Sequence, residues 1–232
     1  MDSTLETLAG SSFDAVLFDM DGTLIDSTAA IVRCWTRWAI EHAVGEEAFA
    51  RAHGHGRPAA DIVADLLPPE LVAAGTQRIT DLEVEDVEGV VRLPGTAELL
   101  AALPRERWAI VTSCTLPLAR ARAGAARLPE PGAWVTFDDV RRGKPDPEPY
   151  LLGARRLGVD PARCLVVEDA PAGLLSGRAA GCATLAVTTT HAPGELVADA
   201  IVASLADVAV EVARAGVRLV PPTGAGRPSA AV

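Results

Sequence analysis

The chain has 232 residues, of which 49% are hydrophobic and only 4% aromatic, and its formal net charge at pH 7 is -10. That length suits one large domain, or a core with a smaller insertion. The acidic balance argues against nucleic acid or an anionic membrane surface as the main partner, because both attract basic faces. A small anionic substrate remains compatible, since it needs only local positive charge. The composition does not distinguish a monomer from a dimer.

The cysteines and the first residues indicate a cytoplasmic protein. No two cysteines have CxxC spacing and no histidine lies near them in a zinc-ligand pattern, so free thiols in a reducing cytosol are expected. The first twelve residues lack the apolar segment of a signal peptide. No apolar run reaches the about 20 residues that span a bilayer. The four cysteines are Cys34, Cys114, Cys164 and Cys182.

The first candidate strand is the apolar run from Phe13 to Phe18, which ends abruptly in two carboxylates. Its length and residue types are those of a buried strand. Asp19 and Asp21 are separated by one residue and point the same way if the backbone stays extended. Two acids crowded at the end of a buried strand are costly unless a cation, hydrogen bonds or chemistry uses them.

The next region reads as helices with no strand pattern between them. Breaks rich in glycine or proline fall at 53–58 and 68–69. Ile31, Trp35 and Trp38 share one side of the first helix, which suits the core of this region or, alternatively, a partner surface. The predicted helices are Thr28–His42, Glu46–Ala52, Ala59–Leu67 and Glu70–Glu88.

From Pro94 onward, strands and helices alternate, with weaker signals up to Arg214. The strands are predicted at 108–112, 133–137, 164–167 and 184–187, and the helices at 96–103, 117–126, 147–157 and 172–181. Such alternation predicts an α/β fold with a Rossmann-like, doubly wound parallel sheet. Ligands of such sheets bind beyond the carboxyl ends of the strands. The predicted domains are a core of 1–25 and 94–220, a helical insertion of 26–93, and a disordered tail of 221–232.

The pair Asp19 and Asp21 has three interpretations. A calcium loop requires glycine at its sixth position and an acid at its twelfth, but Leu24 and Ala30 stand there. Solvated turn acids are the second interpretation. The third is catalytic, with one carboxylate attacking an electrophile and the other moving a proton. A carboxylate that attacks a phosphate dianion needs a divalent cation and an ammonium group to offset the repulsion.

The chain offers a candidate binding site for the divalent cation and a candidate ammonium group. Leu165 to Val167 is an apolar run followed by Glu168 and Asp169, which can hold a hard cation such as Mg²⁺. The alternative is that Asp169 caps the next helix while Glu168 lies on the surface. Lys144 is the only lysine of the chain and stands between Gly143 and Pro145. An isolated loop lysine is ordinarily solvated.

A further segment, Thr112-Ser113-Cys114-Thr115, lies between a predicted strand and a predicted helix. A helix N-terminus offers free amides and a positive dipole to an anion. Hydroxyl residues also cap helices without any ligand, so this segment alone does not establish a phosphate site.

In this order, the four segments resemble the motifs of the haloacid dehalogenase-like phosphatases, and the resemblance extends over about residues 13–187. It implies that Asp19 is a nucleophile that forms an aspartyl-phosphate, and that Asp21 is the general acid and base. Ser113, the amide of Cys114 and Lys144 are implied to bind the phosphate. The implied Mg²⁺ ligands are Asp19, the main-chain carbonyl of Asp21, Glu168 and Asp169, with Glu168 holding either the ion or its water.

The resemblance also implies that the helical insertion is a mobile cap that helps to select the substrate. Arg57, in the glycine-rich break, is the candidate specificity residue. The break is equally compatible with a plain connection between cap helices. His53 and His55 are not expected to bind a metal, because no acid or cysteine clusters with them. A cysteine beside an anion-binding loop, Cys114, is a candidate for easy oxidation.

Within that family, the residues favour hydrolysis of a phosphomonoester. Asp21 argues against dehalogenation, which has no leaving oxygen to protonate. The insertion lacks the lysine of phosphonatases, and Ile31 stands where related sugar phosphomutases carry histidine. A sugar or polyol phosphate is the expected substrate. The alternatives are a phosphoglycolate phosphatase, a β-phosphoglucomutase-like phosphotransferase, or a non-catalytic protein that binds phosphorylated metabolites.

Overall fold

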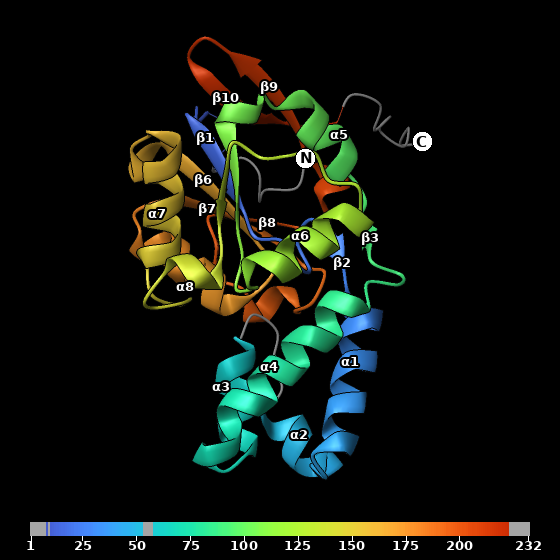
Figure 1. Ribbon diagram of the computed structural model, residues 1–232. Coiled ribbons are helices and arrows are strands. Elements are labelled where there is room, and N and C mark those ends of the chain that lie inside the picture. The colour runs from blue at the N-terminus through green and yellow to red at the C-terminus, as the bar shows by residue number, and fades with distance from the viewer. Residues whose placement is uncertain (1–7, 9, 53–57, 223–232) are drawn as a thin grey trace.

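A six-stranded, fully parallel sheet forms the centre of the protein in a computed structural model that describes residues 8, 10–52 and 58–222 (Figure 1). The strand order is β5-β4-β1-β6-β7-β8. This confirms the predicted α/β fold with a Rossmann-like sheet. The strands are β1 (Ala15–Phe18), β4 (Trp108–Val111), β5 (Ala133–Val135), β6 (Cys164–Glu168), β7 (Ala183–Val187) and β8 (Ala200–Val202).

Helices cover both faces of the sheet, which explains why β1, β4 and β6 are buried along their whole length. Val16 and Phe18 of β1 pack on the face covered by α5 and α6. Ala15 and Leu17 point to the opposite face, where α7 packs. The helices around the sheet are α5 (Thr96–Ala102), α6 (Leu116–Ala125), α7 (Glu148–Leu157) and α8 (Pro171–Ala179).

Four helices within residues 28–85 form a separate lobe at the bottom of Figure 1, called the cap below. Trp35 and Trp38 are buried in its hydrophobic cluster, so they are core residues of the cap. The indole of Trp38 donates to the main-chain oxygen of Gly75 over 2.8 Å. The domain boundaries stay a prediction. The cap helices are α1 (Thr28–Glu41), α2 (Glu46–Ala52), α3 (Ala59–Leu66) and α4 (Pro69–Glu85).

Two antiparallel pairs were not predicted. Strands β2 (Ile25–Asp26) and β3 (Val91–Arg92) pair where the chain enters and leaves the cap. Strands β9 (Ala209–Ala213) and β10 (Gly216–Val220) form a hairpin. Phe13, the predicted start of the first strand, instead pairs with Val217 of this hairpin. Both pairs are too short, or too weakly patterned, to give a distinct sequence signal.

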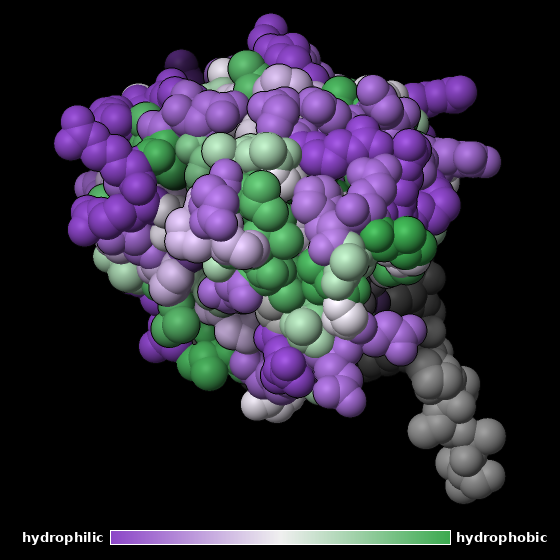
Figure 2. All heavy atoms as spheres, turned by 60° about the horizontal axis from the view of Figure 1, so that its bottom comes forward, coloured by the Kyte–Doolittle hydropathy of each residue, from purple (hydrophilic) through white to green (hydrophobic). Residues whose placement is uncertain are grey.

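Short 3₁₀ turns complete the described chain, and no described helix is long and apolar enough to cross a membrane. The surface on the cap side is mostly hydrophilic, with hydrophobic side chains in limited patches (Figure 2). The predicted disordered tail lies almost entirely outside the described residues. The 3₁₀ turns are η1 (Arg105–Arg107), η2 (Phe137–Asp139), η3 (Pro161–Arg163), η4 (Pro193–Glu195) and η5 (Leu205–Asp207).

Candidate active site

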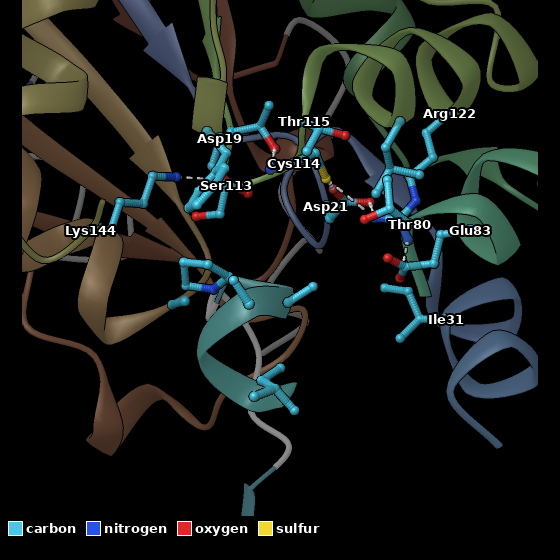
Figure 3. A pocket seen from close by; sticks show the side chains of 18 of the residues that line it. Asp19, Asp21, Ile31, Thr80, Glu83, Ser113, Cys114, Thr115, Arg122 and Lys144 are labelled. Atoms are coloured by element: carbon cyan, nitrogen blue, oxygen red, sulfur yellow. Dashed lines mark hydrogen bonds and ion pairs between the residues drawn. The ribbon is translucent and has the colours of Figure 1, made fainter. Parts of the chain in front are cut away.

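The predicted site segments meet at one edge of the sheet, because parallel strands bring their carboxyl ends together. Asp19 follows β1, Thr112 follows β4 and Glu168 ends β6. A cavity of about 140 Å³ lies between this edge and the cap. Figure 3 shows Asp19, Ser113 and Lys144 around one part of this cavity.

Lys144 is a buried ion-pair partner and not a solvated loop residue. Its Nζ lies 2.6 Å from Oδ1 of Asp19 and 2.6 Å from Oε1 of Glu168. It also donates to the main-chain oxygen of Val111 over 2.9 Å. Only 4% of the side chain is exposed. Burial lowers the pKa of Lys144, but the charges of Asp19 and Glu168 outweigh burial and raise it, so the ammonium form is firmly held.

Glu168 is fixed by hydrogen bonds to both of its oxygens. Oε1 accepts from Lys144 and from the hydroxyl of Tyr150 over 2.8 Å. Oε2 accepts from the amides of Asp169 and Ala170. A Cβ on Gly173 would lie 1.7 Å from Oε1 of Glu168, so this close approach of α8 requires glycine. The alternative of a surface Glu168 is wrong, because the residue is 1% exposed.

Asp169 and Asp19 complete a buried cluster of three acids. One oxygen from each of Asp19, Glu168 and Asp169 lies within 4.8 Å of the others. Burial raises the pKa of Asp19 well above its ordinary value despite Lys144. The pKa of Asp169 is raised to about 7, mainly by burial and to a smaller extent by the charge of Glu168. Three carboxylates gathered so closely supply an all-oxygen ligand set, which fits a hard divalent cation.

The loop after β1 packs directly on Asp169. Gly22 has φ +87°, and a Cβ there would lie 2.3 Å from Oδ2 of Asp169. Thr23 donates to Oδ1 of Asp169 over 3.2 Å, and the hydroxyl of Thr190 bonds Oδ2. The residues Gly22 and Thr23 thus hold the loop after β1 against Asp169, the acid that follows β6.

Asp21 has a separate set of partners. Its Oδ1 accepts from Oγ of Ser27 over 2.5 Å and from Nη1 of Arg122 over 3.0 Å. Its Oδ2 accepts from the thiol of Cys114 over 3.1 Å. The carboxylate is therefore fixed from several directions while 21% of the side chain stays exposed. The interpretation of Asp21 as a solvated turn acid does not fit, because three side chains hydrogen bond to its carboxylate.

Arg122 is the main site residue that the sequence analysis missed. It lies on α6, is 3% exposed, and its Nη2 pairs with Oε1 of Glu83 on cap helix α4 over 2.9 Å. Burial lowers the pKa of Arg122, but Asp21, Cys114 and Glu83 raise it above the ordinary value. Burial raises the pKa of Glu83 while Arg122 opposes that rise. Nothing in the sequence distinguishes the buried Arg122 from Arg120, which lies two positions earlier on the same helix and is exposed.

The segment after β4 is only partly arranged as expected. Ser113 lines the cavity. The amide of Cys114 donates to Oγ1 of Thr112 over 3.1 Å, so it is already bonded. Burial, followed by the charge of Asp21, raises the pKa of the Cys114 thiol well above its ordinary value. A protonated thiol is a poor nucleophile, which argues against easy oxidation. Arg57, together with His53 and His55, lies outside the described residues.

Comparison with known proteins identifies the family of this chain. The sequence profile of the haloacid dehalogenase-like hydrolases matches residues 13–181. Hexitol phosphatase A of Escherichia coli is 45% identical over 185 residues, which cover 74% of this chain and 81% of the relative. Glycerol-1-phosphate phosphohydrolase 1 of Saccharomyces cerevisiae is 36% identical, covering 76% of this chain and 75% of the relative.

Among solved structures, a variant of CbbY from Rhodobacter sphaeroides in complex with xylulose 1,5-bisphosphate has a TM-score of 0.75 at 25% identity. The match covers 84% of this chain and 96% of that chain. The chain belongs to the haloacid dehalogenase-like hydrolases. Its relatives are phosphatases, which confirms the predicted enzyme class.

Proposed function

We propose that the protein hydrolyses the phosphate monoester of a small polyol or sugar, with Mg²⁺ as its cofactor and an aspartyl-phosphate on Asp19 as intermediate. The observation that carries this proposal is the position of Nζ of Lys144, 2.6 Å from both Asp19 and Glu168 beside the cavity between core and cap. The substrate class is supported by the relatives named for hexitol phosphate and glycerol 1-phosphate chemistry.

In the first step, a carboxylate oxygen of Asp19 attacks phosphorus and the bond between phosphorus and the leaving oxygen breaks. Asp21 gives its proton to that oxygen, which leaves as an alcohol. In the second step, a water attacks phosphorus while Asp21 takes the proton. Inorganic phosphate leaves, and the Asp19 carboxylate is restored. Ser27, Cys114 and Arg122 support this role by holding the Asp21 carboxylate in one orientation.

Asp19, Asp169 and the main-chain carbonyl of Asp21 would hold Mg²⁺. When bound, the ion supplies positive charge that offsets the repulsion between the Asp19 carboxylate and the phosphate. Glu168 has hydrogen bonds at both oxygens, so we assign to it the orientation of Lys144. Lys144 and Ser113 would hold the phosphate, because they lie beside Asp19 at the cavity.

A phosphate-release assay with purified protein tests this function. The substrates are sorbitol 6-phosphate, glycerol 1-phosphate, 2-phosphoglycolate and p-nitrophenyl phosphate, each with Mg²⁺ or with EDTA. We expect turnover that depends on Mg²⁺ and that is most efficient with a polyol phosphate. Absence of Mg²⁺-dependent release from all four substrates contradicts the proposal and favours a non-catalytic binding protein.

A further inference from the structure

The cavity has two chemically different ends. Figure 3 shows Lys144 with Asp19 at one end, and Thr80, Glu83 and Arg122 at the other, with Asp21 between them. We propose that Thr76 and Glu83 of cap helix α4, with Arg122, form a subsite for an uncharged, hydroxyl-bearing end of the substrate. The same subsite excludes a substrate whose distal end is a carboxylate. This inference rests on the proposed function.

One face of α4 supplies the cap side of this subsite. Thr76, Thr80 and Glu83 are spaced by four and then three residues, so they share a helix face, and all three line the cavity. Gln77 and Arg78 of the same helix have partners elsewhere. Gln77 donates to Asp81 over 2.7 Å, and Arg78 pairs with Glu41 of α1 over 2.7 Å. Of these two faces, the one that carries Thr76, Thr80 and Glu83 is therefore the one that can contact a ligand between cap and core.

Three cavity-lining residues carry a buried polar atom that has no hydrogen-bond partner among the described residues. These atoms are Oγ1 of Thr76, Oγ1 of Thr115 and Nε of Arg122. Buried polar groups in folded proteins are normally paired, and leaving them unpaired is costly. A hydroxyl group both donates and accepts hydrogen bonds. A substrate with several hydroxyl groups can therefore bond to the threonine hydroxyls and also accept from the guanidinium N–H of Arg122.

The charges at this end select against an acidic substrate. Arg122 is the only cationic side chain at this end among the described cavity-lining residues. It is already paired with two carboxylates, Asp21 at 3.0 Å and Glu83 at 2.9 Å. A carboxylate on the substrate would therefore approach the Glu83 carboxylate, and the guanidinium there is already shared with Asp21 and Glu83, in a site where charge repulsion is poorly screened. A neutral hydroxyl meets no such repulsion.

The test compares the full-length wild type with Thr76→Val and Glu83→Gln, and with Gln77→Ala as a control on the outward face of α4. The substrates are sorbitol 6-phosphate, 2-phosphoglycolate and p-nitrophenyl phosphate, which share a phosphate and differ in the other end. For Thr76→Val we expect kcat/KM for sorbitol 6-phosphate, relative to p-nitrophenyl phosphate, to fall about 10-fold through KM. Thr76→Ser, which restores the hydroxyl, should recover that ratio.

Glu83→Gln keeps the side-chain shape but removes a negative charge and frees Arg122. We expect the preference for sorbitol 6-phosphate over 2-phosphoglycolate to fall at least about 10-fold in this variant, because a charged hydrogen bond is lost and repulsion is relieved. Gln77→Ala should keep both ratios of the wild type. If Glu83→Gln does not fold, as judged by near-ultraviolet circular dichroism, the comparison of Thr76→Val with Thr76→Ser decides.

The inference is overturned if Thr76→Val leaves the sorbitol ratio unchanged, or if the wild type prefers 2-phosphoglycolate. In either case turnover of p-nitrophenyl phosphate shows that the phosphatase function itself stands. If the wild type releases no phosphate from any of the three substrates with Mg²⁺, the proposed function is contradicted, and the subsite inference is contradicted with it.

Discussion

Nζ of Lys144 lies 2.6 Å from Oδ1 of Asp19, although 125 residues separate them in the chain. Both side chains are buried, and burial alone would favour neutral forms of both. Their mutual attraction favours the ionised pair, and Glu168 adds a second acid to the same ammonium. A buried ion pair of this kind is costly to build, so its presence at a cavity indicates use of its charges in chemistry.

The first prediction concerns the reactivity of Lys144. Its raised pKa and its burial should protect the amine from acetylation by an N-hydroxysuccinimide ester near neutral pH in the folded protein. In denaturant, the same amine should react readily. Because Lys144 is the only lysine, peptide mass spectrometry reports the difference directly. Equal acetylation of Lys144 in the folded and denatured protein contradicts the buried ion pair.

The second prediction concerns the type of cation at position 144. Lys144→Met should lower kcat about 100- to 1,000-fold, because a positive charge that stabilises the transferring phosphoryl group is removed. Lys144→Arg should not restore the rate, since a planar guanidinium cannot replace a compact ammonium between Asp19 and Glu168. The matched control is Arg142→Met in the same loop, whose side chain is 73% exposed. Loss of activity in this control points to a disturbed loop instead.

The third prediction separates function from stability at Asp19. Asp19→Asn should abolish turnover, because an amide does not attack phosphorus, yet it should not lower the melting temperature of the metal-free protein. Burial raises the pKa of Asp19, so the ionised carboxylate is a destabilised group at neutral pH. Differential scanning fluorimetry with EDTA measures this. A melting temperature well below that of the wild type shows that Asp19 is needed for the fold.

The fourth prediction links Mg²⁺ to pH. Burial and Glu168 raise the pKa of Asp169 from 3.8 to about 7, so between about pH 4 and 7 the metal-free folded state holds more protons than the unfolded chain. This contribution makes the metal-free protein less stable as pH rises through that window. Because Mg²⁺ binds the ionised carboxylate, it should raise the melting temperature more at about pH 7.5 than at about pH 5.5.

The control for this fourth prediction is Asp169→Asn, which should greatly reduce the stabilisation by Mg²⁺ at both pH values. The same melting-temperature increase at both pH values in the wild type indicates that Mg²⁺ binds away from the acid cluster. Acidic surface groups can bind Mg²⁺ weakly, so the comparison is made at low Mg²⁺ concentration.

The sequence predicts the sheet and the acid cluster because both depend on local patterns. An apolar run that ends in acids, as at Asp19 and at Glu168, is visible in the chain, and parallel strands must bring such ends together. The role of Arg122 could not be predicted in this way. Its partners Asp21 and Glu83 lie 101 and 39 residues away, and the ion pair exists only because the cap packs against α6. Contacts between separately folded segments leave no periodic signal.

The preorganised surroundings of Asp21 were equally hidden. The resemblance of the first motif implied a proton-transfer role for Asp21, but Ser27 and Cys114 gave no sign that they would hydrogen bond to its carboxylate. Cys114 instead suggested a reactive thiol, whereas its burial beside Asp21 raises its pKa. A loop sequence specifies residue types, while the electrostatic environment depends on which elements close over them.

The central claim is that Asp19 forms a covalent bond to phosphorus while Asp21 moves the proton. Asp21→Asn offers the most direct measurement, because it impairs the water-activating step while a leaving group as activated as p-nitrophenolate still departs. Rapid acid quenching and peptide mass spectrometry should then find one phosphoryl group on the peptide that contains Asp19. Release of p-nitrophenol with an unmodified Asp19 peptide, or with the phosphoryl group on another residue, contradicts the covalent mechanism.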